Sequence, residues 1–218
     1  MSYKQITPPI IKRLPRYYRF LEDLEATGMV RVSSKVLSEK MGITASQIRQ
    51  DLNCFGGFGQ QGYGYKIPVL KEEIGKILNL NSKKQLIIIG VGNLGKAIAN
   101  HINFEEKGYE LIGLFDKKES IIGQTVHGLP VRSFDTIEDF CIEHRPSTAV
   151  LCIPKESAER IAYKLVKLGI KGFLNFSHYD LSLSYEGIVV ENVHFGDQLM
   201  ILSYKINNIN NTDNNSEN

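Results

Sequence analysis

The stretch QLIIIGVGNLGKAIAN, residues 85–100, decides the fold of this chain. It begins with a mostly apolar run, Gln85–Ile89, of the kind that forms a buried parallel strand. Glycines then follow in the pattern G-x-G-x-x-G, and a helix is expected over residues 93–103. Strand, glycine loop and helix in this order are typical of a dinucleotide-binding Rossmann unit.

Each glycine of the loop has a separate task in such a unit. Gly90 allows the tight turn, Gly92 lets the backbone approach a pyrophosphate, and Gly95 permits close packing of helix and strand. The helix N-terminus supplies N–H donors for the phosphates. A tight turn without a ligand is the alternative. The predicted cofactor-binding residues of the loop are Gly90, Val91, Gly92, Asn93, Leu94 and Gly95.

The next strand, residues 109–116, ends at Asp116, which lies 21 residues after Gly95. A carboxylate there accepts hydrogen bonds from both ribose hydroxyls and repels a 2′-phosphate, which favours NAD(H) over NADP(H). Lys117 and Lys118 weaken this preference, and a turn residue at the strand end is the alternative for Asp116. Because ligands lie at the carboxyl ends of the strands, Lys117, Pro154, Asn175 and Phe195 complete the predicted cofactor site.

Strands and helices alternate from residue 81 onward, which predicts an α/β domain with a mostly parallel sheet. The segment after Phe195 is expected to form a closing helix over 196–207. The Asn-rich end, 208–218, is expected to be a disordered tail because it has almost no apolar side chains to bury.

The first 80 residues have a different plan. After an amphipathic helix, residues 34–41 predict a short helix with Ser33 as its N-cap and Gly42 as its stop. Thr44 then opens a third helix, where Thr44 and Gln47 match a capping box. Two helices joined by a short Gly-containing turn are typical of a helix-turn-helix.

The glycine-rich segment 55–68 that follows predicts a two-stranded wing, so the expected domain is a winged helix-turn-helix. The second helix of the pair would present side chains to base edges, and basic residues outside it would contact phosphates. A plain helical bundle with a glycine-rich loop is the alternative. The predicted DNA-binding residues are Lys12, Arg19, Thr44, Ser46, Gln47, Arg49, Gln50, Gln61, Tyr63 and Lys66.

Charge is unevenly shared between the two parts. Residues 1–80 carry 12 Lys and Arg against 7 Asp and Glu, a net of +5, whereas residues 81–218 carry 14 against 17, a net of −3. A basic front half predicts an anionic partner. Three cysteines without metal-ligand spacing, no secretory signal and no apolar run long enough for a membrane span predict a cytoplasmic protein without a membrane partner.

A small NAD-dependent oxidoreductase, or a nucleotide-binding subunit of a CoA-ligase-like assembly, is the alternative function. Such an enzyme needs an acid or base near the reacting carbon, and His178 and His194 are the only well-placed histidines. Neither belongs to a recognisable catalytic constellation, so catalysis is not expected. A third possibility is an interaction module whose nucleotide is structural.

Taken together, TASQIRQDLNCFGGFG, FGGFGQQGYGYKIPVL, IIIGVGNLGKAIAN and VVENVHFGDQLMILSY resemble the Rex family of bacterial redox-sensing repressors over about residues 5–206. The resemblance implies a homodimer that binds palindromic operator DNA through paired winged-helix domains. Each Rossmann domain would bind NADH or NAD⁺, and the C-terminal helix would be swapped onto the partner. NADH would favour a closed form that releases DNA, and NAD⁺ would permit binding. Fermentation and NADH-reoxidation genes are the implied targets.

Three residues depart from the family pattern. Family members commonly carry an acid before the pocket phenylalanine, where this chain has His194 before Phe195, and that acid contacts the basic residue matching Arg16. Arg16 and His194 are therefore the predicted switch residues, with a contact that is either rewired or pH-sensitive. His178 stands where the family often has proline, and Gln50 where a basic residue is common.

Overall fold

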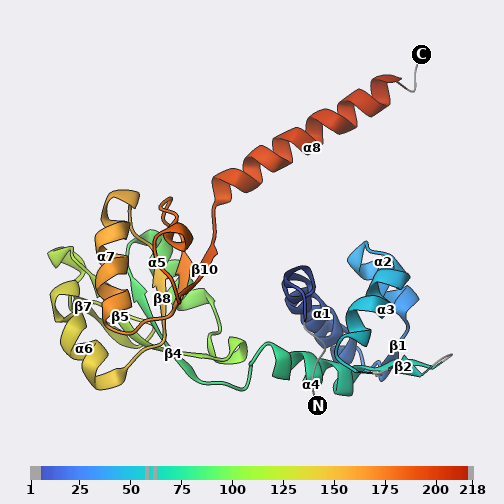
Figure 1. Cartoon of the computed structure of the whole chain (residues 1–218), viewed down its shortest axis with the longest axis horizontal. Helices are drawn as coiled ribbons and strands as arrows, with labels where there is room; N and C mark the ends of the chain where they lie inside the picture. Colours follow the sequence, from blue (N-terminus) through green and yellow to red (C-terminus); the bar gives the residue numbers. More distant parts are fainter. Residues whose placement is uncertain (1–5, 57–58, 61–62, 216–218) are drawn as a thin grey trace. The chain divides into compact units, whose positions relative to one another are not determined.

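The computed structural model describes residues 6–56, 59–60 and 63–215 of the 218 (Figure 1). The chain forms two compact units, Met1–Ser82 with Glu106–Gly108, and Lys83–Glu105 with Tyr109–Asn218. The predicted boundary between residues 80 and 81 lies two residues before this division. We call them the first and the second unit.

The first unit combines helices with a small antiparallel sheet. Its sheet has the strand order β1-β3-β2, in which β2 and β3 pair antiparallel as the predicted two-stranded wing. Its elements are α1 (Pro8–Ala26), β1 (Arg31–Val32), α2 (Ser34–Met41), α3 (Ala45–Asn53), β2 (Gly59–Gln60), β3 (Gly64–Lys66) and α4 (Ile67–Ile77).

The turn between α2 and α3 is fixed by its end residues. The Ser33 hydroxyl accepts a hydrogen bond from the Val36 N–H, and Gly42 closes α2 in the left-handed conformation with φ 63°. The Thr44 hydroxyl then accepts from the Gln47 N–H, so α3 begins where the sequence predicts. These caps satisfy helix-end groups that would otherwise lack partners.

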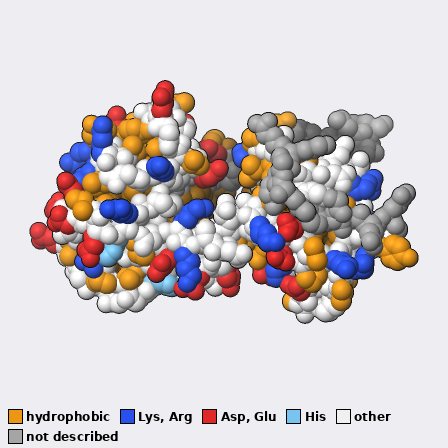
Figure 2. All heavy atoms as spheres, turned by 60° about the horizontal axis from the view of Figure 1, so that its bottom comes forward, with side chains coloured by type: hydrophobic (Ala, Val, Ile, Leu, Met, Phe, Trp, Pro, Cys, Tyr) orange, Lys and Arg blue, Asp and Glu red, His pale blue; other side chains and the backbone are white. Residues whose placement is uncertain are grey.

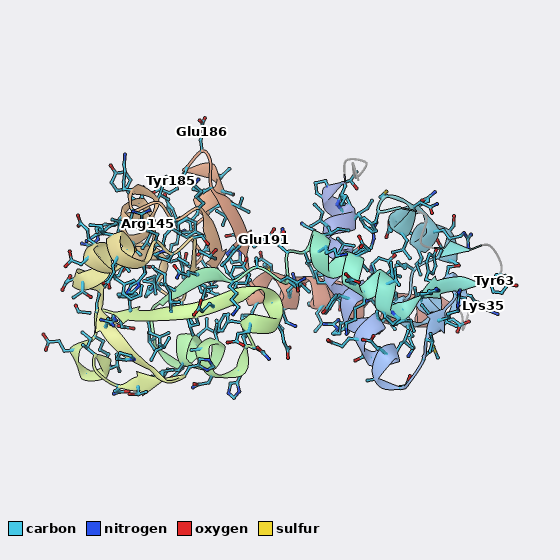
Figure 3. The ribbon with its side chains drawn as sticks, turned by 90° about the horizontal axis from the view of Figure 1, so that it is seen from below. Lys35, Tyr63, Arg145, Tyr185, Glu186 and Glu191 are labelled. Atoms are coloured by element: carbon cyan, nitrogen blue, oxygen red, sulfur yellow. The ribbon has the colours of Figure 1, made fainter. Side chains whose placement is uncertain are left out.

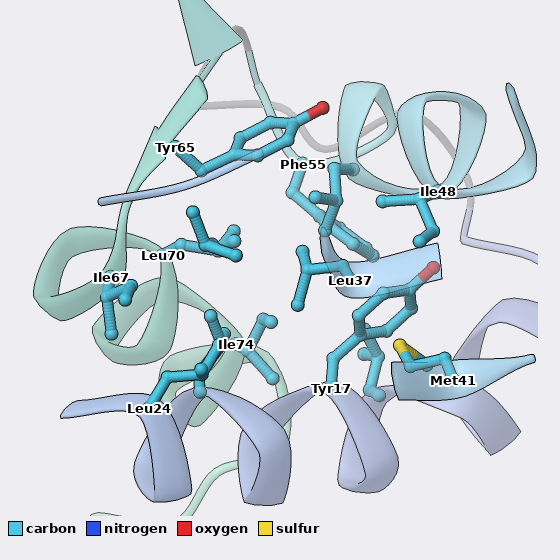
Figure 4. Close-up of a cluster of buried hydrophobic side chains, with 14 of the residues drawn as sticks. Tyr17, Leu24, Leu37, Met41, Ile48, Phe55, Tyr65, Ile67, Leu70 and Ile74 are labelled. Carbon is cyan, nitrogen blue, oxygen red and sulfur yellow. The ribbon is translucent and has the colours of Figure 1, made fainter. Parts of the chain in front are cut away.

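One apolar core holds the first unit together (Figure 4). Tyr17 and Leu24 of α1, Leu37 of α2, Ile48 of α3 and Ile74 of α4 meet in it. Each fully buried side chain of this kind contributes about 1.5–3 kcal/mol. The helix-turn-helix therefore shares one buried core with α1 and α4.

The second unit is built on a seven-stranded sheet of order β10-β9-β8-β4-β5-β7-β6, parallel except for the edge strand β6. Leaving out β6, this is the dinucleotide-binding order 3-2-1-4-5-6 counted along the chain. Its strands are β4 (Lys84–Ile89), β5 (Tyr109–Asp116), β6 (Thr125–Val126), β7 (Leu129–Ser133), β8 (Thr148–Leu151), β9 (Gly172–Asn175) and β10 (Val189–Asn192).

Helices cover both faces of the sheet. Ile87 and Ile89 of β4 point into a core shared with α6 and α7, whereas Ile88 points into a core shared with α5. Two-sided burial explains why β4 is apolar without alternation. The helices are α5 (Asn93–His101), α6 (Ile137–His144) and α7 (Lys155–Lys167), with short 3₁₀ turns at η1 (Glu105–Lys107), η2 (Glu119–Ile121), η3 (Phe134–Thr136) and η4 (Leu181–Leu183).

The last helix, α8 (Phe195–Asn215), is longer than predicted. The sequence predicted a helix over 196–207 followed by a disordered tail over 208–218, and the structure extends the helix to Asn215. Asparagine is a weak helix former but not a breaker, and this stretch contains neither glycine nor proline to stop the helix. Residues 216–218 lie outside the described part. Within the described ranges, no helix is long and apolar enough to cross a membrane.

Candidate nucleotide and nucleic-acid sites

The glycine loop lies at the carboxyl end of β4, next to β8, where the strand order reverses. Gly90 has φ 91°, and a Cβ there would collide with the Cys152 carbonyl oxygen and lie 2.9 Å from Cγ2 of Ile153. A Cβ on Gly95 would collide with the Gly90 carbonyl oxygen, whereas one on Gly92 would meet nothing within 4 Å. Gly90 and Gly95 are therefore required by packing, and Gly92 faces open space.

Asp116 organises this loop. Its carboxylate accepts hydrogen bonds from the Val91 N–H at 2.7 Å, from Lys117 N–H at 2.7 Å and from Lys118 N–H at 2.9 Å. A carboxylate offers about four acceptor positions, so three of them are already used by the backbone. The sequence predicted a ribose ligand, and the structure adds a loop-fixing role that the motif does not reveal.

A cavity of about 270 Å³ opens beside the loop. Predicted residues Gly90, Gly92, Asp116, Lys117 and Pro154 line it, so five positions drawn from three strand ends meet in one place. Cys152 also lines it, and burial raises the pKa of its thiol to about 12, which keeps it protonated and unreactive at neutral pH. The sequence did not indicate the other lining residues: Ile89, Phe134, Ile153, Ser157 and Ile161.

Among the other loop positions, Val91 is buried beneath the loop, and Asn93 and Leu94 begin α5 with exposed side chains. Their side chains are not among the cavity-lining groups given above. In this position Asn93 and Leu94 would serve a phosphate through their N–H groups at the helix N-terminus rather than through their side chains.

Asn175, predicted to line the nicotinamide side, has its side chain fully buried and used within the protein. Its amide nitrogen donates to the Tyr179 carbonyl and to Asn192 Oδ1, both at 2.8 Å. Its amide oxygen accepts from the backbone N–H and from the hydroxyl of Ser177. Asn175 therefore ties β9 to β10. The contact of Asn175 with the cofactor stays a prediction, and in this structure its side-chain amide is satisfied within the protein.

His194 and Phe195 lie just past β10. His194 Nε2 is 3.1 Å from the Ser177 carbonyl oxygen, its Nδ1 is 3.4 Å from an oxygen of Asp197, and its ring lies 5.2 Å from that of His178. The Phe195 side chain is 63% exposed, and its ring centroid is 6.2 Å from that of Phe176. The Asp197 contact was not foreseen. Arg16 belongs to the first unit, so its pairing with His194 stays a prediction.

In the first unit, α3 presents Ser46, Arg49 and Gln50 to solvent, and Thr44 at its start is also exposed. Arg49 donates to the Ser34 hydroxyl at 3.2 Å, which holds its guanidinium beside the start of α2. These are the positions from which a recognition helix reaches base edges in a major groove. Arg49 and Gln50 can therefore serve the role that the sequence predicts.

Gln47 has a different role. Its amide nitrogen donates to Asp51 Oδ1 at 2.8 Å, and the same carboxylate accepts two bonds from Arg13 and one from Tyr17. In the predicted capping box the Gln47 side chain would bond the backbone N–H of Thr44, and here it bonds Asp51 instead. A buried carboxylate needs donors more than a helix-end N–H near water needs an acceptor. Neither Asp51 nor Arg13 was singled out from the sequence.

The structure places a further basic residue, Arg31, beside the wing. Arg31 of β1 donates to the Tyr63 carbonyl oxygen at 3.1 Å, and its guanidinium lies 5.9 Å from the centre of the Tyr63 ring. Tyr63 is 72% exposed, and it points outward at the same end of the unit as Lys35 (Figure 3). Lys66 is exposed. Gln61, also predicted to contact DNA, lies outside the described residues.

Basic side chains of α1 complete this unit's surface. Lys12, Arg16 and Arg19 are exposed, and the Arg16 guanidinium lies 5.5 Å from the Phe20 ring. On the face that Figure 2 shows, basic and acidic side chains are interspersed over both units. The positive balance of the first unit is therefore a sum over its surface rather than one patch on that face.

Comparison with models of known protein families gives one match in each of the two units. Residues 5–53 match the family model described as "Putative DNA-binding protein N-terminus", and residues 81–179 match the model described as "CoA binding domain". The first range contains α1 to α3, and the second contains the glycine loop and the sheet as far as β9.

Relatives match over nearly the whole chain. The redox-sensing transcriptional repressor Rex of Caldicellulosiruptor saccharolyticus is 47% identical over 94% of this chain and 93% of its own length. Its namesake from Clostridioides difficile is 48% identical over 94% of this chain and 97% of its own length.

Solved structures show the same likeness. A crystal structure of RSP in complex with β-NAD⁺ and operator DNA is 45% identical, with a TM-score of 0.88 over 97% of both chains. A crystal structure of RSP in complex with β-NADH is 42% identical, with a TM-score of 0.87 over 97% of this chain and 99% of that one. The chain therefore belongs to the Rex family of redox-sensing transcriptional repressors.

Proposed function

We propose that this protein is a transcriptional repressor that binds palindromic operator DNA through the first unit and NADH or NAD⁺ through the second. In this function NADH releases the operator, and NAD⁺ or an empty site permits binding. The observation that carries the proposal is the pairing of an exposed, capped recognition helix with a glycine loop whose Gly92 faces an open cavity.

The DNA-binding part of the proposal rests on the exposed side chains of α3. Ser46, Arg49 and Gln50 are exposed on α3, and Arg or Gln can form paired hydrogen bonds with guanine or adenine. Tyr63 and Lys66 on the wing and Lys12 and Arg19 on α1 would contact the backbone, because phosphate contacts tolerate loose geometry. Binding of operator DNA and of this cofactor pair supports the expectation of a cytoplasmic protein.

The expected difference between NADH and NAD⁺ binding rests on the charge of the nicotinamide ring. NAD⁺ carries a cationic nicotinamide ring and NADH a neutral one, and burying an unpaired charge against apolar side chains costs free energy. Cation–π attraction to Phe195 opposes this but is worth only about 0.5–2 kcal/mol. We therefore expect NADH to bind more tightly than NAD⁺.

The C-terminal helix supports a homodimer. All residues of α8 from Phe195 to Ile209 are exposed, including the large apolar residues Leu199, Met200, Leu202 and Tyr204. A lone subunit rarely exposes a contiguous apolar surface of this kind. We expect α8 to pack on a second copy of the chain, as the family resemblance implies.

An enzyme is the weaker candidate. The relatives that span about 95% of the chain are named as repressors. Steady-state NADH consumption with a panel of carbonyl substrates is expected to stay at the level of the buffer.

Calorimetry on both ligands tests the proposal. NADH is titrated into the protein alone and into the protein saturated with a palindromic duplex. If NADH lowers operator affinity, the operator must weaken NADH binding by the same factor, which for a coupling of about 1–3 kcal/mol is roughly 5- to 150-fold. Equal NADH affinity with and without operator would contradict the proposed function.

A further inference from the structure

His178 and His194 bring two imidazole rings together in the second unit, where β9 and β10 end. The ring centroids lie 5.2 Å apart, with an angle of 33° between the ring planes. The two strands are parallel neighbours whose last residues, Asn175 and Asn192, lie in register. Residues that are distant in the sequence therefore meet at the carboxyl edge of the sheet. We call His178 and His194 the histidine pair.

Both ring nitrogens of His194 face oxygen atoms that accept hydrogen bonds. Nε2 lies 3.1 Å from the Ser177 carbonyl oxygen, and Nδ1 lies 3.4 Å from a carboxylate oxygen of Asp197. Neither a carbonyl oxygen nor an ionised carboxylate has a hydrogen to donate, and a neutral imidazole carries hydrogen on only one nitrogen. Only the doubly protonated, positively charged ring can donate on both sides, so this geometry favours a proton on His194.

The charged groups that the described part of the second unit brings to the pair differ in their effect on this proton. Asp197 at the start of α8 and Asp180 in the loop before η4 are exposed acids that interact with His194 and stabilise the proton. His178 opposes a second proton, because two positive rings at 5.2 Å repel each other. Arg16, the predicted partner from the first unit, would oppose the proton as well. The pair therefore holds one positive charge more readily than two, and the two rings titrate together.

The strand order brings the expected nicotinamide ring to the histidine pair. The glycine loop follows β4, and Asp116, the predicted ribose ligand, ends β5 on one side of β4. A dinucleotide crosses the sheet where the strand order reverses, so its other half extends over the carboxyl ends of β8 and β9 on the opposite side. Phe176 and Phe195, whose ring centroids are 6.2 Å apart, lie within two residues of the pair in the sequence. The pair therefore borders the aromatic side chains expected beside the nicotinamide.

The two redox forms of the cofactor respond differently to a positive neighbour. NAD⁺ carries a cationic nicotinamide ring and NADH a neutral one, while their phosphates and riboses are the same. Like charges repel more strongly beside a protein surface than in bulk water, because the effective dielectric constant is lower there. A proton on the pair therefore weakens NAD⁺ binding and has little effect on NADH. Imidazole side chains change their charge between about pH 5 and 8, so this repulsion varies near neutral pH.

We propose that the histidine pair determines specificity between the two redox forms by binding one proton, which disfavours NAD⁺ and leaves NADH bound. Acidification then raises the Kd for NAD⁺ but not that for NADH, so NADH displaces NAD⁺ at a lower ratio of NADH to NAD⁺. Linkage requires the converse, that exchange of NAD⁺ for NADH draws a proton onto the pair. The proposal rests on the nucleotide-binding part of the proposed function.

Titration of the full-length chain with both nucleotides at about pH 6, 7 and 8 and constant ionic strength tests the pair. The chain has no tryptophan, so the fluorescence of bound NADH is measured without tryptophan emission, and displacement of NADH gives the Kd for NAD⁺. We expect the NAD⁺ Kd to rise at least about threefold from pH 8 to pH 6, as repulsion between two partly solvated charges would cause. The NADH Kd should stay within about twofold over the same range.

Substitutions separate charge from packing. His194→Gln should flatten the pH dependence of the ratio of the two Kd values, and His178→Gln, at an exposed position, should reduce it. His194→Lys keeps a positive charge at every pH tested and should keep NAD⁺ binding weak throughout. Asp197→Asn should shift the rise in NAD⁺ Kd to lower pH, because the protonated ring loses its carboxylate. A role of His194 in packing alone would produce neither the Lys result nor the Asn shift.

His101→Gln is the matched control, since His101 is exposed at the end of α5 and does not line the nucleotide cavity as the described residues form it. It removes one imidazole and should retain the full pH dependence. A Kd ratio that is constant with pH in the unmodified chain, or whose change survives in His194→Gln, would refute the role of the pair while NADH binding still supports the proposed function. Absence of NADH binding at every pH would refute both.

Discussion

Arg13 and Asp51 form a two-pronged ion pair between α1 and α3. Arg13 Nε lies 2.7 Å from Asp51 Oδ2, and Arg13 Nη2 lies 2.8 Å from Oδ1. The Asp51 side chain is fully buried, and it also accepts bonds from Tyr17 and Gln47. This network fixes the recognition helix on α1, so that the exposed residues of α3 hold one orientation.

Asp51→Asn should destabilise the first unit strongly. The substitution leaves Arg13 without its carboxylate in a part-buried site, and breaking a buried ion pair costs about 3–5 kcal/mol. Glu25→Gln, which breaks a partly exposed pair with Lys71, should cost about 1 kcal/mol. Urea unfolding monitored by circular dichroism measures both, and equal losses would contradict the role of the network.

The same pair should make the first unit sensitive to acid. Burial alone raises the pKa of Asp51, but hydrogen bonds from Arg13, Gln47 and Tyr17 outweigh burial and hold the pKa below its ordinary value. The network therefore stabilises the fold fully above pH of about 4, and this contribution is lost as the pH falls through the lower folded-state pKa. Unfolding of Asp51→Asn should lack this component, which parallel urea titrations from pH 6 down to about pH 3 would show.

Gly90→Ala should lower both stability and NADH binding, whereas Gly92→Ala should lower NADH binding alone. At Gly90 the methyl group meets the Cys152 carbonyl oxygen at a positive φ, so we expect a loss of at least about 2 kcal/mol together with loss of NADH binding. At Gly92 the methyl group meets nothing in the protein and should block only the pyrophosphate. Thermal unfolding and NADH titration separate the two. A Gly92→Ala protein that binds NADH normally would contradict the assigned phosphate site.

Three substitutions should separate base reading, phosphate contact and architecture in the first unit. Arg49→Ala should cost about 1–3 kcal/mol and relax specificity, whereas Lys12→Ala should weaken binding to all sequences equally and lower the salt dependence. Gln47→Ala should act mainly on stability, because its amide is held by Asp51. Anisotropy with operator and scrambled duplexes at two salt concentrations measures this. Equal loss of specificity for Arg49→Ala and Lys12→Ala would refute the assignment.

Phe195→Ala tests the nicotinamide side. The Phe195 ring lies beside Phe176 at the start of α8, and it should contribute to discrimination between the two ring charges. We expect the NADH Kd to rise several-fold, by roughly 1 kcal/mol for a lost aromatic contact, while the ADP Kd stays unchanged. Equal losses for NADH and ADP would indicate a structural effect instead.

The glycine loop and the helix caps were predictable because their signals are local. Gly90, Gly92 and Gly95 stand within six residues of one another, and Ser33 and Thr44 each act on an N–H three residues away. Backbone conformation and packing at such positions depend on few neighbours. The parallel sheet followed from the same source, since a two-sided buried strand such as β4 is apolar throughout.

Side-chain pairing across the fold was not predictable in this way. Asp51 meets Arg13 across 38 residues, and Asn175 meets Asn192 across 17. Nothing in a single sequence says which polar group a buried carboxylate or amide will choose. Gln47 and Asn175 were therefore expected to face ligands, and the structure pairs their side chains within the protein.

Fluorescence anisotropy of a labelled palindromic operator, titrated with protein at fixed salt, tests redox sensing most directly. The titration is run without nucleotide, with NAD⁺ and with saturating NADH. We expect tight binding in the first two conditions and at least about fivefold weaker binding with NADH, as a coupling of 1 kcal/mol or more requires. Operator affinity that is the same in all three conditions would contradict redox sensing by this chain.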